Sequence, residues 1–242
     1  MNTEKRIVIV LPAYNEAAFL RPNVEKLAVF LKSRNLPAKI VIAENGSIDN
    51  TRQVAENLAE EFPGVVSLMS LKVKGKGNAV ISGWLSNQAD IYVYMDSDLS
   101  TDLNALPEAL REIFSGSDIV IGSRYMRSSR VIVSRYRLFF SFFYKQIIRL
   151  VFNSKISDFQ CGFKAANRNV VNEIVPRIQD GCWFFDTELL LLAERKMFKI
   201  KEIPVNWANQ PGRKSKVSPI SLSIQNIRKI ITLKKRFNGE GF

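Results

Sequence analysis

Short apolar runs alternate with longer segments of helical period through the first half of the chain. The runs are rich in Val and Ile and predict β-strands, and apolar residues recur at helical spacing in the segments between them. The predicted strands are 6–11, 39–43, 65–70, 91–95 and 118–121, and the predicted helices include 16–31, 50–61 and 78–87. Strand and helix in alternation predict an α/β fold with a doubly wound, mostly parallel sheet.

The second half of the chain departs from this alternation. Residues 134–153 are aromatic, basic and of helical period, 180–195 lead into another helix, and 199–207 are typical of a strand. Residues 158–168 are typical of an irregular or β segment, and the polar stretch 208–219 has the composition of a loop. No internal repeat is present, so we expect one domain with a C-terminal elaboration.

The C-terminal tail predicts one more helix. Isoleucines at 220, 224, 227 and 231 recur at helical spacing, with basic residues among and after them. We therefore expect a catalytic domain over 1–219, with 134–153 as an amphipathic interfacial helix within it, and a basic amphipathic helix over 220–242. Such a helix is suited to an anionic membrane surface, and solvated surface charge is the alternative.

The segments that follow the predicted strands are the places to look for chemistry. In an open α/β sheet, ligands bind beyond the carboxyl ends of the strands. These segments are PAYNE (12–16), ENGSIDNT (44–51), KVKGKGNA (72–79), DSDLSTD (96–102) and GSRY (122–125).

Two aspartates stand where the apolar run 91–95 stops. In an extended segment, residues two positions apart face the same side, so Asp96 and Asp98 can address one ligand together. Mg²⁺ and Mn²⁺ prefer oxygen ligands, and Mg²⁺ is commonly held by one or two carboxylates plus substrate phosphates. A turn whose aspartates cap the next helix is the alternative.

The segments after the second and third strands offer groups for a nucleotide. Glu44 and Asn45 can accept hydrogen bonds from a base or ribose, whereas Asp49 is better explained as a cap of the following helix. Gly75 and Gly77 allow close approach of the backbone to a ligand, and lysines beside them are available for phosphate. Neither G-x-G-x-x-G nor a P-loop pattern is present, which disfavours a dinucleotide-dependent oxidoreductase and a P-loop NTPase.

Composition narrows the chemistry further. The chain has 35 basic and 23 acidic residues, a net charge of +12, no histidine and only two cysteines, Cys161 and Cys182. The charge favours an anionic partner, such as nucleic acid, a phosphorylated substrate or an acidic membrane. Histidine-based zinc sites and Ser/His/Asp triads are excluded. We expect reduced thiols, no signal peptide and, because no apolar run reaches about 18 residues, no membrane span.

The ordered motifs resemble one known family. VLPAYNE, ENGSIDNT, GKGNA, DSDLS, GSRY, DFQCGFK and FFDTELL occur in the order and spacing of family 2 inverting glycosyltransferases of GT-A fold. The resemblance covers about 6–218 and is strongest to the dolichyl-phosphate mannose and glucose synthase group. It implies a Rossmann-like, doubly wound sheet and transfer of a sugar from a nucleotide to a polyprenyl phosphate.

The resemblance also implies the donor site. It places Pro12, Tyr14, Glu16, Ile42 and Glu44 around the nucleotide base and ribose. The remaining donor contacts are implied to be Lys76, Asp96, Ser97 and Lys216, and the residues that bind the metal, Mg²⁺ or Mn²⁺, are implied to be Asp96 and Asp98.

The chain departs from the mannosyl pattern at two positions, and the second of these departures favours a UDP-sugar. Ser100 replaces a common glutamine, which puts the third metal contact in question, and Gln210 stands where mannosyl relatives carry arginine. Together with DFQCGFK and GKGNA, the second departure favours the glucosyl-type group.

The acceptor in this family is a lipid phosphate, and its chemistry agrees with the lack of histidine. A phosphate monoester has a second pKa of about 6, so at neutral pH much of it is dianionic and needs no strong base. The resemblance implies that Arg124 binds the acceptor phosphate, and that a second arginine, Arg137 or alternatively Arg135, binds it as well. Arg137 and Ser141 share one face of the predicted helix.

The acids of FFDTELL have two interpretations. Asp186 and Glu188 match acids of the glucosyl-type relatives and could act in catalysis by holding sugar hydroxyls or orienting the acceptor. They could equally cap the helix that begins there.

The resulting hypothesis is a metal-dependent inverting glycosyltransferase, peripheral on the cytoplasmic face of a membrane. It would move a hexose from a UDP-glucose-like donor to a polyprenyl (dolichyl) phosphate. A GDP-mannose-dependent dolichyl-phosphate mannose synthase and an enzyme with a saccharide or diacylglycerol acceptor are the rival enzymes. A basic nucleic-acid-binding module would explain the charge but gives the paired acids and the glycine segment no role, so we expect no nucleic acid partner.

Overall fold

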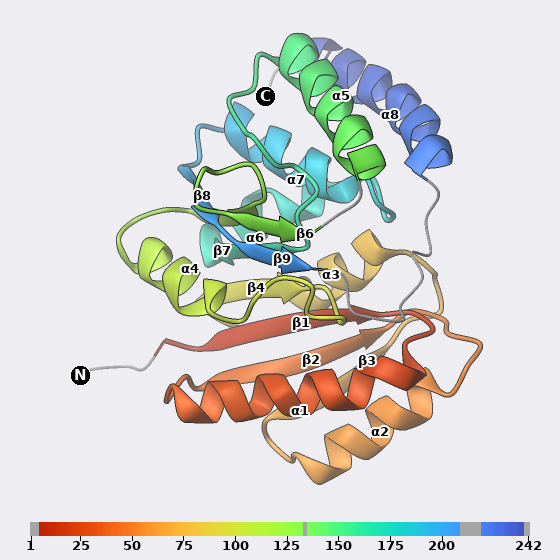
Figure 1. Ribbon diagram of the computed structural model, residues 1–242, viewed down its shortest axis with the longest axis vertical. Helices are drawn as coiled ribbons and strands as arrows, with labels where there is room; N and C mark the ends of the chain where they lie inside the picture. The colour runs from red at the N-terminus through yellow and green to blue at the C-terminus, as the bar shows by residue number, and fades with distance from the viewer. Residues whose placement is uncertain (1–4, 133–134, 209–218, 240–242) are drawn as a thin grey trace.

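The computed structural model describes residues 5–132, 135–208 and 219–239, without the side chains of 135–140 and 219–225. A seven-stranded sheet runs through its centre in the order β3-β2-β1-β4-β7-β5-β8 (Figure 1). Its strands are β1 (Ile7–Ala13), β2 (Ala38–Glu44), β3 (Val66–Ser70), β4 (Ile91–Met95), β5 (Ile119–Ser123), β7 (Phe163–Asn167) and β8 (Ile200–Pro204).

All neighbouring strands are parallel except around β7, which is antiparallel to β4 and to β5. The five strands predicted from the first half are all present, and the predicted doubly wound, mostly parallel sheet is confirmed. The segment 158–168 supplies β7, and 199–207 divides into β8 and β9 (Asn206–Ala208).

Helices cover both faces of the sheet (Figure 1). On one side lie α1 (Ala17–Ser33), α2 (Thr51–Glu61) and α4 (Ala105–Phe114), and on the other α3 (Lys76–Leu85), α6 (Arg168–Glu173), the short 3₁₀ helix η1 (Val175–Arg177) and α7 (Phe185–Arg195). Alternate residues of each strand enter opposite cores: Ile9 packs with the first group of helices and Val10 with the second. Because both faces are covered, the central strands β1 and β4 are continuously apolar.

Two helices distant in sequence lie side by side at one end of the molecule (Figure 1). They are α5 (Arg135–Phe152) and α8 (Pro219–Gly239), and the rings of Phe152 and Phe237 meet with centroids 5.5 Å apart. On α5, Ile148 is buried, whereas Leu150 is 88% exposed. The helix therefore contributes to the core on one side and presents apolar surface on the other. None of the described helices has the length and apolar content needed to cross a bilayer.

A small second sheet holds the segment that follows β4. It pairs β6 (Arg130–Ile132) with β9 in parallel. The Ala208 amide donates to the Ser100 carbonyl, and the Asp102 amide donates to the Asn206 carbonyl, both at 2.9 Å. The segment that carries the paired aspartates is thus fixed from β4 on one side and from β9 on the other. The predicted helices 134–153 and 220–242 correspond to α5 and α8, while the division of the chain at residue 219 stays a prediction.

Candidate active site

The paired aspartates lie in the turn that ends β4, a strand whose residues are all buried. The Asp96 amide donates to the Gly162 carbonyl at 2.9 Å, which ties this turn to the start of β7. Asp98 is 5% exposed, and its Oδ1 accepts hydrogen bonds from the Ser100 amide at 3.0 Å and the Ser100 hydroxyl at 2.6 Å. Asp98 does not cap α4, which begins only at Ala105. Ser100 therefore orients the Asp98 carboxylate, a role that sequence reasoning did not assign to it.

A pocket of about 330 Å³ opens beside these aspartates at the carboxyl edge of the sheet. Predicted donor residues that line it are Pro12, Tyr14, Lys76, Asp96, Ser97 and Asp98. The lining also contains Asn45, Lys74 and Gly75, which the segments after β2 and β3 offered for a nucleotide or its phosphates, and Cys182 and Trp183, which were not predicted as site residues. Cys182 and Trp183 directly precede the motif FFDTELL, and they are distant in sequence from the other residues that line the pocket.

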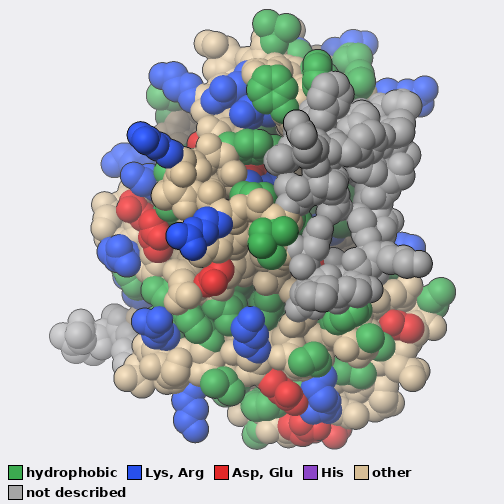
Figure 2. Space-filling view, in the orientation of Figure 1, with side chains coloured by type: hydrophobic (Ala, Val, Ile, Leu, Met, Phe, Trp, Pro, Cys, Tyr) green, Lys and Arg blue, Asp and Glu red, His purple; other side chains and the backbone are tan. Residues whose placement is uncertain are grey.

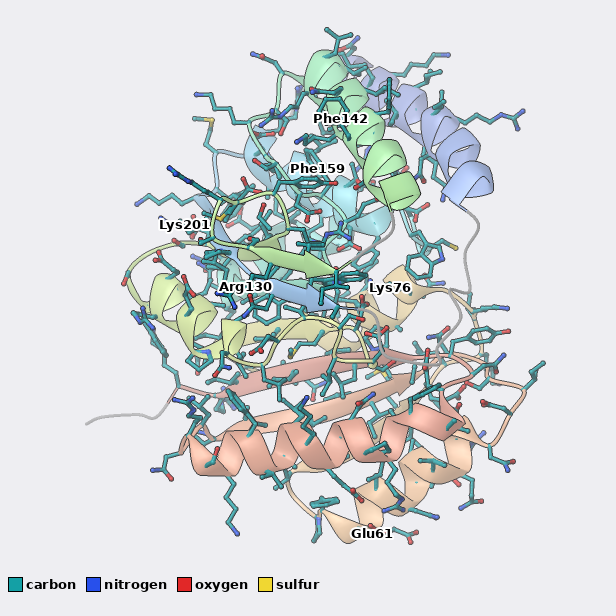
Figure 3. All side chains as sticks on the ribbon, in the orientation of Figure 1. Glu61, Lys76, Arg130, Phe142, Phe159 and Lys201 are labelled. Atoms are coloured by element: carbon teal, nitrogen blue, oxygen red, sulfur yellow. The ribbon has the colours of Figure 1, made fainter. Side chains whose placement is uncertain are left out.

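Lys76 is the cation that faces the paired acids. It is the first residue of α3, where Figure 3 labels it, and its Nζ lies 2.7 Å from Asp96 Oδ1 and 3.9 Å from Asp186 Oδ2. Its side chain is only 9% exposed. Burial alone would lower the pKa of Lys76, but the carboxylates of Asp96 and Asp186 outweigh burial and raise the pKa. The ammonium is therefore charged at any physiological pH.

A second buried lysine stands behind Lys76. Lys164 is fully buried in β7, and its Nζ lies 2.5 Å from Asp186 Oδ1 and 2.8 Å from the Cys161 carbonyl. Tyr94 also donates to Asp186, and burial together with that carboxylate raises the pKa of Tyr94 well above its usual value. Asp186 thus serves as the shared counter-ion of two lysines, because an unpaired charge at this depth would be very costly. It does not line the pocket.

The glycines of the segment after β3 approach the protein's own backbone. A Cβ added to Gly75 would lie 2.2 Å from the Gly181 carbonyl oxygen. The Gly77 amide donates to the Cys182 carbonyl at 3.0 Å, and the Asn78 amide donates to the Gly181 carbonyl at 2.8 Å. We expected both glycines to allow close approach of a ligand. This expectation is corrected for Gly77, which packs against the backbone of Asp180 and Gly181. The amides of Gly77 and Asn78 are therefore already paired within the protein.

Three described residues that were predicted to contact the donor, Glu16, Ile42 and Glu44, lie outside the pocket lining. Ile42 is fully buried in the core formed with α1 and α2, because every residue of β2 from 40 to 44 is buried and Ile42 points to that face. Glu44 is 4% exposed, and its Oε1 accepts a hydrogen bond from the Ser47 amide at 2.5 Å. The placement of Ile42 does not support a contact with the nucleotide, and Glu44 shapes the loop beside the pocket.

Glu16 and the segment after β2 are joined at the start of α1. The Glu16 amide donates to the Thr51 hydroxyl at 2.7 Å, and Asp49 Oδ1 accepts from the Thr51 amide at 2.9 Å. Asp49 therefore supports the first turn of α2, as expected from its position. Glu16 itself is buried and does not line the pocket.

Arg124 follows β5 and is held by a buried carboxylate. Its Nε and Nη2 lie 2.8 Å and 2.9 Å from the two Asp158 oxygens, and its backbone amide donates to the same carboxylate at 3.0 Å. Burial would lower the pKa of Arg124, but the Asp158 carboxylate outweighs burial and raises the pKa. For Asp158 the effects are reversed: burial would raise its pKa, but the Arg124 guanidinium lowers it. Arg124 does not line the donor pocket. Asp158 was not predicted, although it opens the motif DFQCGFK.

The other predicted acceptor residues lie on α5 or outside the described residues. Ser141 accepts a hydrogen bond from the Tyr125 hydroxyl at 2.5 Å, which joins α5 to the segment after β5. Arg135 and Arg137 belong to α5, but their side chains lie outside the described residues, as does the whole of Lys216.

Glu188 has structural partners away from the donor pocket. Its carboxylate accepts from the Gln179 amide at 3.1 Å and the Asp180 amide at 2.9 Å, and lies 2.8 Å from Nη1 of Arg236 on α8. It is 3% exposed and lines a separate, smaller pocket between α7 and α8. These contacts support a structural role for Glu188 rather than the catalytic one considered from the sequence.

Asp96 and Asp98 are suited to a hard divalent cation. They provide carboxylate oxygens at one strand end, inside a pocket large enough for additional oxygen ligands from a substrate. Within the described residues, no group of three or more His, Cys, Asp or Glu side chains could hold a metal ion. The donor set therefore fits a cation that shares its coordination with a phosphorylated ligand.

Comparison with known proteins gives the class of this chain. Residues 8–175 match the family model described as Glycosyl transferase family 2, and the chain belongs to this family of glycosyltransferases. Crystal structures of glucosyl-3-phosphoglycerate synthase from Mycobacterium tuberculosis share the fold: one, in complex with Mn²⁺, uridine diphosphate and phosphoglyceric acid, has a TM-score of 0.71 at 15% identity and covers 96% of this chain and 78% of that one. The GT-A type of α/β fold predicted from the motifs is confirmed.

Similar curated proteins narrow the comparison within the family. Glycosyltransferase AglD of Haloferax volcanii is 35% identical over 83% of this chain, which spans only 33% of AglD. The dolichyl-phosphate beta-glucosyltransferase ALG5A of Trichomonas vaginalis is 33% identical over 87% of this chain and 68% of its own length. The dolichyl-phosphate beta-glucosyltransferase of Dictyostelium discoideum is 30% identical over 95% of this chain and 74% of its own length.

Proposed function

We propose that this chain transfers glucose, with inversion, from UDP-glucose to a polyprenyl phosphate at a membrane surface, using Mg²⁺ or Mn²⁺. The observation that carries the proposal is the pocket in which Asp96, Asp98 and Lys76 meet at the carboxyl edge of the sheet. Similarity to enzymes named dolichyl-phosphate beta-glucosyltransferases supports glucose and a polyprenyl phosphate over the mannosyl alternative.

The donor diphosphate would bind among the positive charges of the pocket. Asp96 and Asp98 would hold the metal, which supplies positive charge to the leaving diphosphate when bound. Lys76 would add a second positive charge, and Lys74, whose Nζ lies 3.9 Å from the ring centroid of Tyr14, a third. Fixed charges in a water-poor site stabilise a leaving group without the cost of reorganisation.

The acceptor phosphate would attack C1 of the sugar directly. An oxygen of the phosphate forms the new bond to C1 while the bond from C1 to the nucleotide diphosphate breaks, and UDP leaves with the bonding electrons. Because the dianion is already nucleophilic, no side chain has to remove a proton. Arg124 would position this phosphate: a guanidinium has five N–H donors, and the bonds to Asp158 use two of them.

The surface of α5 and α8 is suited to the membrane that carries such an acceptor. Phe142, Phe143 and Leu150 of α5 are 46%, 50% and 88% exposed, and Ile231 of α8 is 52% exposed. Figure 2 shows hydrophobic and basic side chains interspersed at this end of the molecule. Exposed apolar groups ringed by cations favour an interfacial position, each Lys or Arg near an anionic surface contributing about 1 kcal/mol. A peripheral site on the cytoplasmic face is part of the proposal.

One assay tests the proposal. The full chain is incubated with polyprenyl phosphate in vesicles containing anionic lipid, with UDP-glucose or GDP-mannose and with Mg²⁺ or Mn²⁺, and lipid-linked hexose is measured by mass. We expect product from UDP-glucose in the presence of the metal and none when a chelator removes the metal. The Asp98→Asn variant should give no product. Asp90→Asn, a matched change at the opposite end of β4, is the control. Product from GDP-mannose alone, no product at all, or full activity in chelator would overturn the proposal.

A further inference from the structure

Residues 179–183, here called the bridging loop, connect η1 to α7 and touch three parts of the molecule. Cys182 and Trp183 line the donor pocket, and the ring centroid of Trp183 lies 5.2 Å from Lys76 Nζ. The carbonyls of Cys182 and Gly181 accept hydrogen bonds from the Gly77 and Asn78 amides in the first turn of α3. The opposite side of the loop faces α8. The wall of the pocket is thus continuous with the contact surface of the C-terminal helix.

Two ion pairs fasten α8 to the bridging loop and to the start of α7. Lys229 Nζ lies 2.5 Å from Asp180 Oδ2, and Arg236 Nη1 lies 2.8 Å from Glu188 Oε1. Arg236 Nη2 also donates to the Arg177 carbonyl at 2.8 Å. The side chains of Asp180 and Glu188 are only 12% and 4% exposed, so these pairs are better shielded from solvent than ordinary surface pairs.

The acids in these pairs also determine the conformation of the loop. Asp180 Oδ1 accepts the Cys182 amide at 2.9 Å and the Phe184 amide at 3.0 Å, and Glu188 accepts the amides that open the loop. Loss of the cation from α8 would leave each shielded carboxylate with backbone partners alone. Rearrangement of the carboxylates toward solvent would then move the carbonyls that hold the start of α3, and with them Lys76.

We propose that Lys229 and Arg236 of α8 are positioning residues for the nucleotide-sugar: they act through Asp180 and Glu188 to keep the bridging loop against the donor pocket. This inference rests on the proposed function for the identity of the donor. It makes α8 part of the donor site as well as of the surface that meets the membrane. Among the basic residues of α8, Lys229 and Arg236 face the loop, whereas Lys234 lies over the Phe152 ring of α5. The others face solvent.

The solvent-facing group supplies matched controls. Arg228 and Lys235 are exposed on the same helix, and within the described residues neither makes an ion pair. Arg228→Met and Lys235→Met each remove one positive charge from α8, as Lys229→Met and Arg236→Met do. Any effect of charge on vesicle association is common to all four variants, whereas an effect on the bridging loop is confined to two of them.

The experiment measures UDP affinity by calorimetry in Mn²⁺ and the rate of Cys182 alkylation in the free enzyme. We expect Lys229→Met and Arg236→Met to weaken UDP binding by about 2- to 30-fold, the range of couplings through residues that do not touch a ligand. Cys182, which is exposed, should be alkylated at an altered rate in both. The KM for UDP-glucose should rise relative to the controls, whereas the KM for the lipid phosphate should not change. Lys229→Arg, which keeps the positive charge, should retain the UDP affinity that Lys229→Met loses.

UDP affinity and alkylation rates equal to those of the Arg228 and Lys235 variants would overturn the proposal. A rise only in the KM for the lipid phosphate would also overturn it, because it would assign both residues to the membrane surface. Failure of the proposed function is a separate result: if the wild-type chain transfers no sugar, the alkylation rates still report whether α8 holds the bridging loop.

Discussion

Removal of the Lys164 ammonium tests the buried charge network behind the donor pocket. Lys164→Met keeps most of the aliphatic length and deletes the cation that lies 2.5 Å from Asp186. Asp186 is 2% exposed, and it would keep the Tyr94 hydroxyl and the more distant Lys76, whose Nζ lies 3.9 Å away. The carboxylate would then be buried with one direct neutral partner.

The expected loss is large because one partner of a buried pair is removed. Breaking such a pair typically costs about 3–5 kcal/mol in the free energy of unfolding. In a chain of this length each kcal/mol lowers the melting temperature by about 2–4 °C, so the variant should melt roughly 6–20 °C below wild type. Replacing both partners, in Lys164→Met with Asp186→Leu, should recover much of this loss, since an apolar pair of similar volume is often tolerated.

Thermal and urea unfolding at neutral pH measure these differences. Lys201→Met on β8, where the lysine is exposed and labelled in Figure 3, is the matched control and should change the unfolding free energy by less than about 0.5 kcal/mol. A Lys164→Met loss below about 1 kcal/mol, or a double variant no more stable than the single one, would refute the view that Asp186 depends on this cation.

Three further predictions follow from the site. Ser100→Ala should weaken Mn²⁺ binding in the presence of UDP by about 10- to 100-fold by releasing the Asp98 carboxylate, and unchanged affinity would contradict that role. Cys182 should react with iodoacetamide in the native protein and be protected by UDP, whereas Cys161, which is buried with its pKa raised to about 11, should react only after unfolding; peptide mass mapping distinguishes them. Arg124 lowers the pKa of Asp158 below the usual 3.8, so the stability from this pair is present above that pH and is lost as the pH falls through the lowered value. In Asp158→Asn the free energy of unfolding should therefore fall less steeply as the pH is lowered. The same decrease with falling pH as in the wild type would contradict this prediction.

The strands of the first half could be predicted because local signals bound them. β4 was predicted to its last residue, since an apolar run between Asp90 and Asp96 leaves little freedom in where the strand begins and ends. β7 was left open between an irregular and a β segment, because its place depends on pairing with β4 and β5 and its second residue is a lysine. Lys164 is acceptable there only because Asp186 meets it, which no local pattern reveals.

The site was predictable where it lies at strand ends and not where distant segments meet. Asp96 and Lys76 follow from strand position and motif, and they do line one pocket. Trp183 and Cys182 reach that pocket through the bridging loop, whose contact with α3 depends on backbone hydrogen bonds that carry no side-chain signature. Ile42 was assigned by motif alone, and the alternation of side chains along β2 directs it into the core.

The antiparallel strand β7 has a geometric consequence for the reaction. It lies between β4, which ends at the paired aspartates, and β5, which ends just before Arg124. Two strand spacings of 4.7–4.9 Å therefore separate these ends, about 9–10 Å. Were β5 hydrogen-bonded directly to β4, the leaving diphosphate and the incoming phosphate would crowd each other. In the proposed reaction, the inserted strand would act as a spacer that leaves the width of one sugar ring between the two phosphates.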